Sequence, residues 1–481
     1  MLRVEHVGPG HRPDGQGPHR RGRVVTAPEA NAEETASVAE ADRSRQGYPT
    51  PLRAWWSVGV LTVLYTLSLL DRQVLALLVS NIRADLRISD FEMGVLQGVV
   101  FSLFYVTFGL GFGWLIDRFS RRGMAYLGVT IWSLATASCG LAHNFIQIMG
   151  ARFGVGAGEA ALNPAAYSIL SDTFPKRRLS LAISVFGMGA YLGTGASLLL
   201  GGFLIASLPA HGMTVPVLGH LQTWRVVMLI AGLPGLLLAL LIWTMADPPR
   251  RERLQGRSSL RDTLLFMRSH WRFFTGHFLG FGLLSAASSG SQAWAPTYLV
   301  RHFDMPISQV VGILATVTIL PGIAGGLLSG YVADRLFARG RTDAHLRYFV
   351  VSGAVELLAL AVAMTANRLD VFIVFSALFA AATGYAGTAP AALQLVTPNN
   401  YRGQVSSAYL FVFNLVGGGL GPTMVGALTT YLFRSDAKVG WAVALNAALM
   451  IPLAILAFIF AMGPMRRAVA ESARWSSPAS D

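Results

Sequence analysis

Long apolar runs separated by short polar connections dominate the sequence from residue 55 to residue 462. A helix of about 20 apolar residues is long enough to cross the hydrocarbon core of a bilayer. With only 13% charged residues, a soluble multidomain protein of 481 residues is not expected. The pattern predicts an all-α membrane protein with twelve transmembrane helices, at approximately 55–80, 91–116, 122–142, 145–170, 179–206, 224–245, 270–299, 307–333, 346–366, 369–393, 403–432 and 438–462.

The distribution of basic residues predicts the orientation of these helices. Most of the 38 Lys and Arg residues lie in the two terminal tails and in the even-numbered connections. Short loops rich in Lys and Arg stay in the cytoplasm, so both termini are predicted to be cytoplasmic. The net charge of +13 is therefore a topology signal, and we expect no nucleic-acid partner. We expect a multi-pass protein of the bacterial inner membrane.

The chain divides near its middle, at a connection that is rich in arginine. Residues 1–50 have no apolar stretch of the kind that a secretory signal contains, and their composition predicts a disordered cytoplasmic tail. The expected order is this tail, a six-helix half at 51–246, a basic cytoplasmic linker at 247–269, a second six-helix half at 270–465 and a cytoplasmic tail at 466–481. The linker is either a solvated connection or an interfacial helix with Leu260, Leu264, Leu265 and Met267 on one apolar face.

A short motif, G-x-x-x-D-R, occurs at corresponding places in the two halves. GWLIDR at 113–118 and GYVADR at 330–335 each end an even-numbered apolar run and lead into an arginine-rich loop. Two related six-helix halves are typical of transporters built from parallel repeats. The predicted fold is therefore a pair of pseudo-symmetric six-helix halves, with both termini cytoplasmic.

Each residue type in this motif has a physical role in a loop that changes its contacts between conformations. Glycine permits close helix approach, aspartate can face the positive end of a neighbouring helix, and arginine can anchor the loop to anionic headgroups. The alternative is a plain basic cytoplasmic loop. The residues assigned to the two loops are Gly113, Asp117, Arg118, Arg121, Arg122, Gly330, Asp334 and Arg335.

Strong charges within the apolar runs are confined mainly to the first half. Arg152 and Glu159 are seven residues apart and lie on one helix face, while Asp71 and Arg72 lie deep in the first run. Between Arg152 and Glu159 lie three glycines, Gly154, Gly156 and Gly158, which allow a neighbouring helix to pack closely. Pro164 can bend the helix shortly after them. A charge at membrane depth costs roughly 3 kcal/mol on insertion scales, so these side chains should face a cavity or a partner.

Two interpretations of these charges follow. In the first, Asp71 and Glu159 take up and release protons, and Arg152 and Arg72 are the cationic partners that exchange between conformations. In the second, the charges form a static salt bridge that orders the bundle. Sodium in place of protons is also compatible with carboxylate ligands.

The chain resembles the major facilitator superfamily over about residues 55–462. GWLIDRFSRRG is close to that family's loop between its second and third helices, although Ser120 stands where a glycine is usual. RFGVGAGEA and LLDRQVLALLVSNIRADLRISDFEMGVLQG resemble the spinster-like branch, which pairs a first-helix Asp-Arg with a fourth-helix Arg and Glu. The resemblance implies a monomeric, proton-coupled or facilitated transporter of amphiphiles such as lysophospholipids or sphingoid lipids.

A secondary transporter that alternates access is therefore the expected function, and an enzyme is not. No Cys/His cluster has the spacing of metal ligands, and no phosphate-binding loop is present, so no metal or cofactor is expected. Expected partners are protons, membrane lipids and either an amphiphile or a small organic anion. The alternative is an uncoupled facilitator, or an exporter of organic acids or drug-like solutes. Candidate substrate contacts are Gln97, Tyr105, Gln292, Trp294, Tyr385, Gln394 and Asn414.

Overall fold

The computed structural model describes residues 48–209, 211–247, 249, 259–398 and 400–475. The predicted N-terminal tail lies almost wholly outside these residues, as do residues 248 and 250–258 of the linker. From Pro49 onward the chain forms one compact unit. The domain boundaries expected from the sequence therefore stay a prediction.

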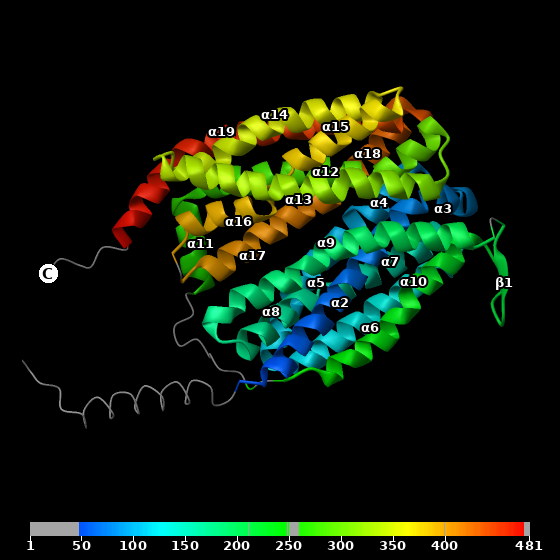
Figure 1. The fold of residues 1–481 in the computed structure, drawn as a ribbon, viewed down its shortest axis with the longest axis horizontal. Coiled ribbons are helices and arrows are strands. Elements are labelled where there is room, and N and C mark those ends of the chain that lie inside the picture. The colour runs from blue at the N-terminus through cyan, green and yellow to red at the C-terminus, as the bar shows by residue number, and fades with distance from the viewer. Residues whose placement is uncertain (1–47, 210, 248, 250–258, 399, 476–481) are drawn as a thin grey trace, which may run out of the picture. The chain divides into compact units, whose positions relative to one another are not determined.

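Helices account for all of the first six apolar runs (Figure 1). They are α2 (Pro51–Leu77), α3 (Val79–Leu86), α4 (Asp90–Gln97), α5 (Val99–Arg118), α6 (Arg121–Cys139), α7 (Phe145–Glu159), α8 (Leu162–Thr173), α9 (Lys176–Ser207), α10 (Thr223–Ala239) and the 3₁₀ turn η1 (Leu240–Thr244). A two-stranded hairpin, β1 (Met213–Val215) and β2 (Gly219–Leu221), lies between α9 and α10. We did not expect this hairpin, because three-residue strands have no hydrophobic repeat.

The second six apolar runs are also helical. They are preceded by α11 (Leu260–Ser269) and comprise α12 (Trp271–Phe303), α13 (Ile307–Ala338), α14 (Ala344–Thr365), α15 (Leu369–Ala382), α16 (Tyr385–Val396), α17 (Arg402–Val412), η2 (Phe413–Leu420), α18 (Gly421–Ala427), η3 (Leu428–Phe433), η4 (Asp436–Lys438) and α19 (Val439–Trp475). The segments η2 and η3 are π-helical and belong to the eleventh run.

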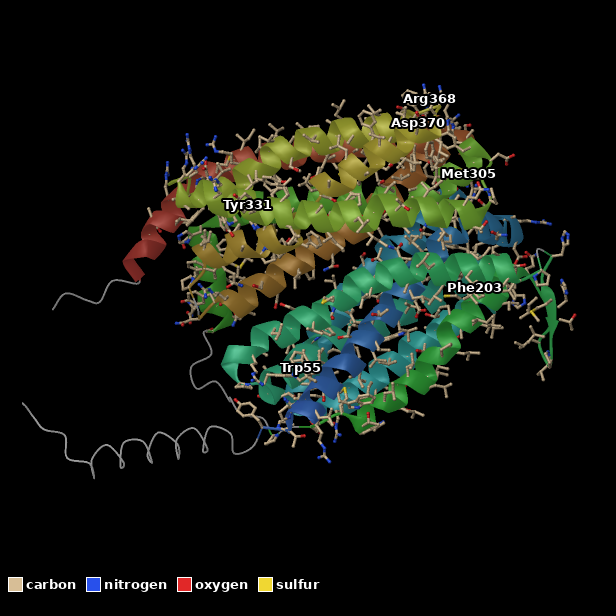
Figure 2. All side chains as sticks on the ribbon, viewed as in Figure 1. Trp55, Phe203, Met305, Tyr331, Arg368 and Asp370 are labelled. Carbon is tan, nitrogen blue, oxygen red and sulfur yellow. The ribbon has the colours of Figure 1, made fainter. Side chains whose placement is uncertain are left out.

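Nine helices among the described residues are long and apolar enough to cross a membrane. The helical membrane fold is thus confirmed, whereas the count of twelve crossings and the cytoplasmic termini stay predictions. Labelled side chains agree with alternating crossings, since Phe203, Met305 and Arg368 lie toward one end of the bundle and Trp55 and Tyr331 toward the other (Figure 2). We call the first end the outer end, following the predicted topology.

The fourth apolar run is broken directly beside one of its charges. Helix α7 ends at Glu159 and α8 begins at Leu162. A proline has no N–H to donate, and its ring clashes with the carbonyl four residues earlier. For Pro164 that carbonyl belongs to Ala160, at the break itself. The helix is therefore interrupted where Pro164 predicts a bend, and Glu159 is the last residue of α7.

Glycines permit close helix approach around this break. A Cβ at Gly156 would lie 2.7 Å from the carbonyl oxygen of Phe101, and one at Gly158 would lie 2.5 Å from the backbone nitrogen of Trp132. Gly113 and Gly330 were also predicted to permit close helix approach. This is wrong for the present conformation, because a Cβ at either position would meet nothing within 4 Å. Both loop glycines lie where the helix surface is open.

Adding a single methyl group at Gly158 should therefore destabilise the fold. We expect Gly158→Ala to cost roughly 1–3 kcal/mol through overpacking against α6. The matched control is Gly150→Ala in the same helix, where a Cβ would meet nothing within 4 Å. Thermal unfolding in detergent should show a lower midpoint only for Gly158→Ala. Equal midpoints for the two variants would contradict this packing account.

Candidate functional site

An ion pair between α2 and α7 forms the centre of the candidate site. Arg72 Nε donates to Glu159 Oε2 over 2.7 Å, and Ser68 Oγ donates to the same oxygen over 2.9 Å. The Glu159 side chain is fully buried, whereas that of Arg72 is 26% exposed. The guanidinium also lies 4.3 Å from the centre of the Phe101 ring. The carboxylate thus lies behind the arginine, and the arginine faces open space.

Arg152 has a different environment, although its side chain is also buried. Its Nε donates to the Leu96 carbonyl over 3.3 Å, and its guanidinium lies 5.4 Å from the Phe101 ring. Leu96 is in the last turn of α4, whose terminal carbonyls carry partial negative charge. Within the described residues Arg152 forms no ion pair. Of the two arginines predicted to exchange partners, only Arg72 holds a carboxylate in this conformation.

Asp71 faces away from the ion pair, toward α6. Its Oδ2 accepts from Thr136 Oγ1 over 3.0 Å, and its Oδ1 has no hydrogen-bond partner among the described residues. The residue is 1% exposed. Asp71 and Glu159 therefore differ in their partners, which are a hydroxyl for the former and a guanidinium for the latter.

A polar cavity of about 250 Å³ lies between the two halves. Both arginines face it, whereas neither Asp71 nor Glu159 is among its lining residues. The second half contributes only neutral polar groups to this wall. The polar side chains lining the cavity are Arg72, Gln73, Gln97, Ser102, Arg152, Thr194, Ser289, Gln292 and Asn414.

A more apolar cavity of about 80 Å³ adjoins the polar one. The two share Gln73, Ala76, Thr194 and Gln292 in their walls. The far wall of the second cavity comes from the second half and includes Leu314, Val317, Met364, Phe372 and Phe379. Together the cavities provide a cationic end and an apolar end.

The predicted substrate contacts separate into two groups. Gln97, Gln292 and Asn414 line the polar cavity, and the Tyr105 hydroxyl accepts from Asn163 Nδ2 beside it over 3.1 Å. Tyr105 itself and the remaining three residues line neither cavity. Trp294 is buried and donates to the Pro422 carbonyl over 3.0 Å, Tyr385 packs 5.8 Å from Phe413, and the Gln394 carbonyl accepts from Arg402.

The first G-x-x-x-D-R loop joins parts of one half. Arg121 forms ion pairs with Asp172, at the end of α8, and with Asp247, after η1. Arg122 Nε lies 3.2 Å from Asp247 and its Nη1 donates to the Met245 carbonyl. These contacts tie the start of α6 to the inner ends of two other helices. The side chain of Asp117 lies outside the described residues, and Arg118 is exposed.

The second loop is more open. The Asp334 side chain is 84% exposed and lies 3.9 Å from His345, in the first turn of α14. Arg335 Nη1 donates to the Tyr331 hydroxyl in its own helix over 3.0 Å. Asp334 thus lies near the N-terminus of a neighbouring helix, and its capping role stays a prediction.

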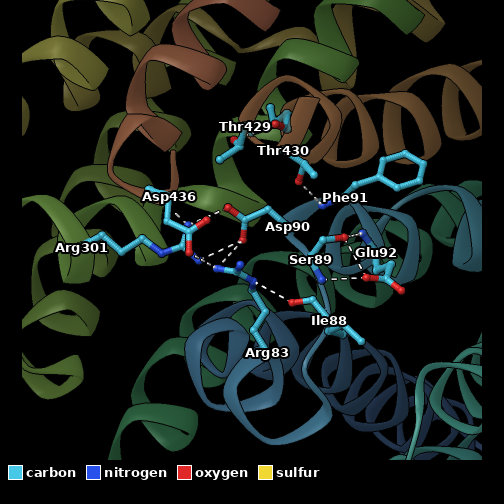
Figure 3. Close-up of polar contacts among 11 residues, drawn as sticks. Arg83, Ile88, Ser89, Asp90, Phe91, Glu92, Arg301, Thr429, Thr430 and Asp436 are labelled. Atoms are coloured by element: carbon cyan, nitrogen blue, oxygen red, sulfur yellow. Dashed lines mark hydrogen bonds and ion pairs between the residues drawn. The ribbon is translucent and has the colours of Figure 1, made fainter. Parts of the chain in front are cut away.

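A charge network at the outer end was missed by the sequence analysis (Figure 3). Asp90, 1% exposed, accepts two bonds from Arg301, with Nη1–Oδ2 at 2.7 Å and Nη2–Oδ1 at 2.9 Å. Arg83 Nη1 lies 3.1 Å from Asp90 Oδ1 and 2.7 Å from Asp436 Oδ2. The network joins α3 and α4 of the first half to α12 and η4 of the second.

Two sequence signals point to this network. Ser89 and Glu92 form a capping box that fixes the first turn of α4, and this S-x-x-E pattern is readable in SDFE. Arg83 and Arg301 are also unusual because arginine is scarce in the odd-numbered connections. Neither signal identifies the partner in the other half, because the contacts of Arg301 with Asp90 and of Arg83 with Asp436 join positions more than 200 residues apart in the sequence.

Close backbone packing accompanies the charge network. A Cβ at Gly98 would lie 2.4 Å from the Gly419 carbonyl oxygen, and one at Gly94 would lie 2.6 Å from that of Pro422. Thr423 Oγ1 donates to the Gly94 carbonyl over 3.0 Å. Helices α4 and α18 of the two halves are thus in contact near the outer end.

Comparison with known proteins identifies the family. Residues 61–422 match the Major Facilitator Superfamily. The chain belongs to this superfamily. It is 29% identical to an MFS-type efflux pump of Mycolicibacterium smegmatis, over 92% of this chain and 100% of the pump. It is 25% identical to the sphingosine-1-phosphate transporter SPNS2 of Xenopus tropicalis, over 79% and 75% of the two chains.

A solved structure supports the same fold. The chain superposes on a bacterial homologue of the human lysosomal transporter Spinster, described as inward-facing and unoccupied, with a TM-score of 0.74. The superposition covers 90% of this chain and 100% of the homologue, at 23% identity. The resemblance to spinster-like members of the superfamily is thus confirmed, and the membrane-transporter class with it.

Removing the central carboxylate of the outer network should loosen this end. In Asp90→Asn, Arg83 and Arg301 lose their shared anion and repel each other. Breaking a buried ion pair costs roughly 3–5 kcal/mol. We therefore expect a cysteine introduced as Gln97→Cys to react about tenfold or more faster with an impermeant thiol reagent added from outside when Asp90→Asn is also present than when Asp90 is intact. The native Cys139 is buried and should stay silent.

The control for this variant is Asp370→Asn. Asp370 pairs with Arg368 at 2.7 Å, but both side chains are well exposed, so the pair should contribute little. Reporter labelling should match that of the unmodified protein. Equal labelling in Asp90→Asn and Asp370→Asn would show that the network does not hold the outer end closed.

Proposed function

We propose that the protein is a secondary transporter that moves an anionic amphiphile together with a proton. The observation that carries the proposal is the order of charges at the site. Two arginines face the polar cavity, and Glu159 lies behind Arg72. A cavity lined in this way favours a carboxylate or phosphate group, because guanidinium forms bidentate, charge-assisted hydrogen bonds with both.

Coupling follows from competition for Arg72. Glu159 and an anion in the cavity compete for the same guanidinium group. When Glu159 takes up a proton, its attraction for Arg72 falls and the guanidinium becomes available to the anion. Proton binding and anion binding then favour each other by the same factor, as linkage requires. Positive coupling of this kind corresponds to movement of both in the same direction.

The adjoining cavities support an amphiphile over a fully polar acid. The anionic group would lie against Arg152 and Arg72, and an acyl or sphingoid chain would lie along Leu314, Phe372 and Phe379. Transport of sphingosine-1-phosphate by a relative that is 25% identical fits this assignment, because that lipid has a phosphate and a long chain. A small organic acid is the second candidate, since it requires only the polar cavity.

The contacts between halves support an inward-facing state. The Asp90 network and the α4–α18 packing close the end that the topology prediction places outside. Alternating access would require these contacts to break while new contacts form at the inner ends. The loop contacts of Arg121 and Arg122 would then hold the first half together as it moves, because they lie within that half.

The first test is proton movement in proteoliposomes that contain an internal pH dye. Lysophospholipids, sphingoid phosphates and short organic acids are added in turn without an imposed gradient. We expect saturable proton flux with the phosphate-bearing amphiphiles, lost in Glu159→Gln, while exchange of labelled substrate continues. Saturable substrate flux without any proton movement would instead support the uncoupled facilitator.

A matched control is available in the second half. Glu356 on α14 is also fully buried, but it lines neither cavity and has no arginine partner among the described residues. Glu356→Gln should therefore keep substrate-coupled proton flux. Loss of coupling in both variants would show that the assay responds to any buried carboxylate, and the role assigned to Glu159 would fail.

Arg152 gives a separate test of the anion site. Arg152→Gln should weaken anion binding by about tenfold or more, because a charge-assisted hydrogen bond contributes roughly 1.5–3 kcal/mol. Equilibrium binding of a labelled lysophospholipid measures this directly. Arg122→Gln is the control, since Arg122 contacts Asp247 far from the cavity walls. Unchanged binding in Arg152→Gln would assign the anion to Arg72 alone.

A further inference from the structure

A third cavity, of about 510 Å³, lies where α11, α12 and α19 meet, apart from the candidate transport site. The turn between α11 and α12 forms one wall, and the last third of α19 forms the other. Its lining residues are Ser269, His270, Trp271, Arg272, Phe273, Pro464, Arg467, Ala468 and Glu471. None of these residues lines the polar or apolar cavity between the halves.

The charges in this third cavity favour an anion. Arg272 and Arg467 come from different helices, and neither forms an ion pair within the described part of the chain. The carboxylate in the wall belongs to Glu471, whose Oε2 lies 3.1 Å from His270 Nε2. The neighbouring Arg466 differs from Arg467, because it lies 3.8 Å from Asp343 and does not line the cavity. Two guanidinium groups are thus available to one ligand.

The surroundings place this cavity at the membrane surface. Trp271 is the first residue of α12, its ring is 52% exposed, and it lies 5.9 Å from the ring of Phe460. Tryptophan is enriched at the boundary between hydrocarbon and headgroups. Helix α11 leaves Leu260, Leu264 and Leu265 exposed, as a helix lying in that boundary does. These features are typical of a cavity at the boundary between hydrocarbon and headgroups.

We propose that the third cavity binds the phosphate group of an anionic phospholipid from the surrounding membrane. Arg272 and Arg467 hold the phosphate from two sides, and the exposed Trp271 contacts the glycerol and upper acyl region. Basic pockets between transmembrane helices bind anionic headgroups by this combination of charge and apolar contact. A free phosphate ion would satisfy the arginines but would leave the exposed Trp271 side chain uncovered.

The test compares two phosphate sources on the full-length protein. Thermal unfolding is measured in detergent after addition of phosphatidylglycerol, phosphatidylcholine or inorganic phosphate. We expect the unfolding midpoint to rise with phosphatidylglycerol and to stay unchanged with phosphatidylcholine or inorganic phosphate. In the double variant Arg272→Gln/Arg467→Gln the apparent affinity for phosphatidylglycerol should fall about tenfold or more. Each arginine near the membrane surface raises the affinity for anionic lipid by roughly fivefold.

Two further variants keep this proposal falsifiable. Arg466→Gln is the matched control and should respond to phosphatidylglycerol as the unmodified protein does. Glu471→Gln removes the negative charge from the cavity and should strengthen the response. An unchanged response in the double variant would overturn the site, and an equal response to inorganic phosphate would overturn the assignment to lipid.

Discussion

The ion pair between Arg72 and Glu159 is the interaction on which the rest of the site depends. A carboxylate that is fully buried at membrane depth is costly unless a cation is in contact with it. Arg72 meets that requirement from α2, and the break after α7 lets Glu159 reach it. The same geometry turns the guanidinium toward the cavity. The ion pair that compensates the buried Glu159 thus also accounts for one of the two arginines, Arg72, in the wall of the cavity.

The two halves contribute differently, although they share a fold. The first half supplies every charged residue that lines the polar cavity, and the second supplies Ser289, Gln292 and Asn414 together with the apolar wall. The proposed linkage between a proton on Glu159 and an anion at Arg72 therefore lies within one half. The second half provides hydrogen bonds and apolar surface whose strength does not depend on the proton. This division follows from the confinement of the strong membrane-depth charges mainly to the first half.

Much of this could be predicted from the sequence because membrane helices follow a simple physical rule. Apolar length predicts the helices, and charges at membrane depth mark candidate site residues. Of Asp71, Arg72, Arg152 and Glu159, the two arginines line the polar cavity, and the roles of all four stay predictions. The pairing was harder to predict, because sequence spacing does not show which carboxylate meets which arginine. The outer network of Asp90, Arg301 and Arg83 was missed for the same reason. Its members are ordinary surface residues until the two halves meet.

The loop glycines show where sequence reasoning fails in a protein that changes conformation. Gly113 and Gly330 have no neighbour within 4 Å here, whereas Gly94 and Gly98 are in close contact with α18 and η2 of the other half. A transporter needs small residues at whichever surfaces meet in each state, and one structure contains only one set of contacts. The outer end uses its glycines in this conformation. If the inner ends close in another, Gly113 and Gly330 lie at the inner ends of α5 and α13, where added bulk would oppose that closure.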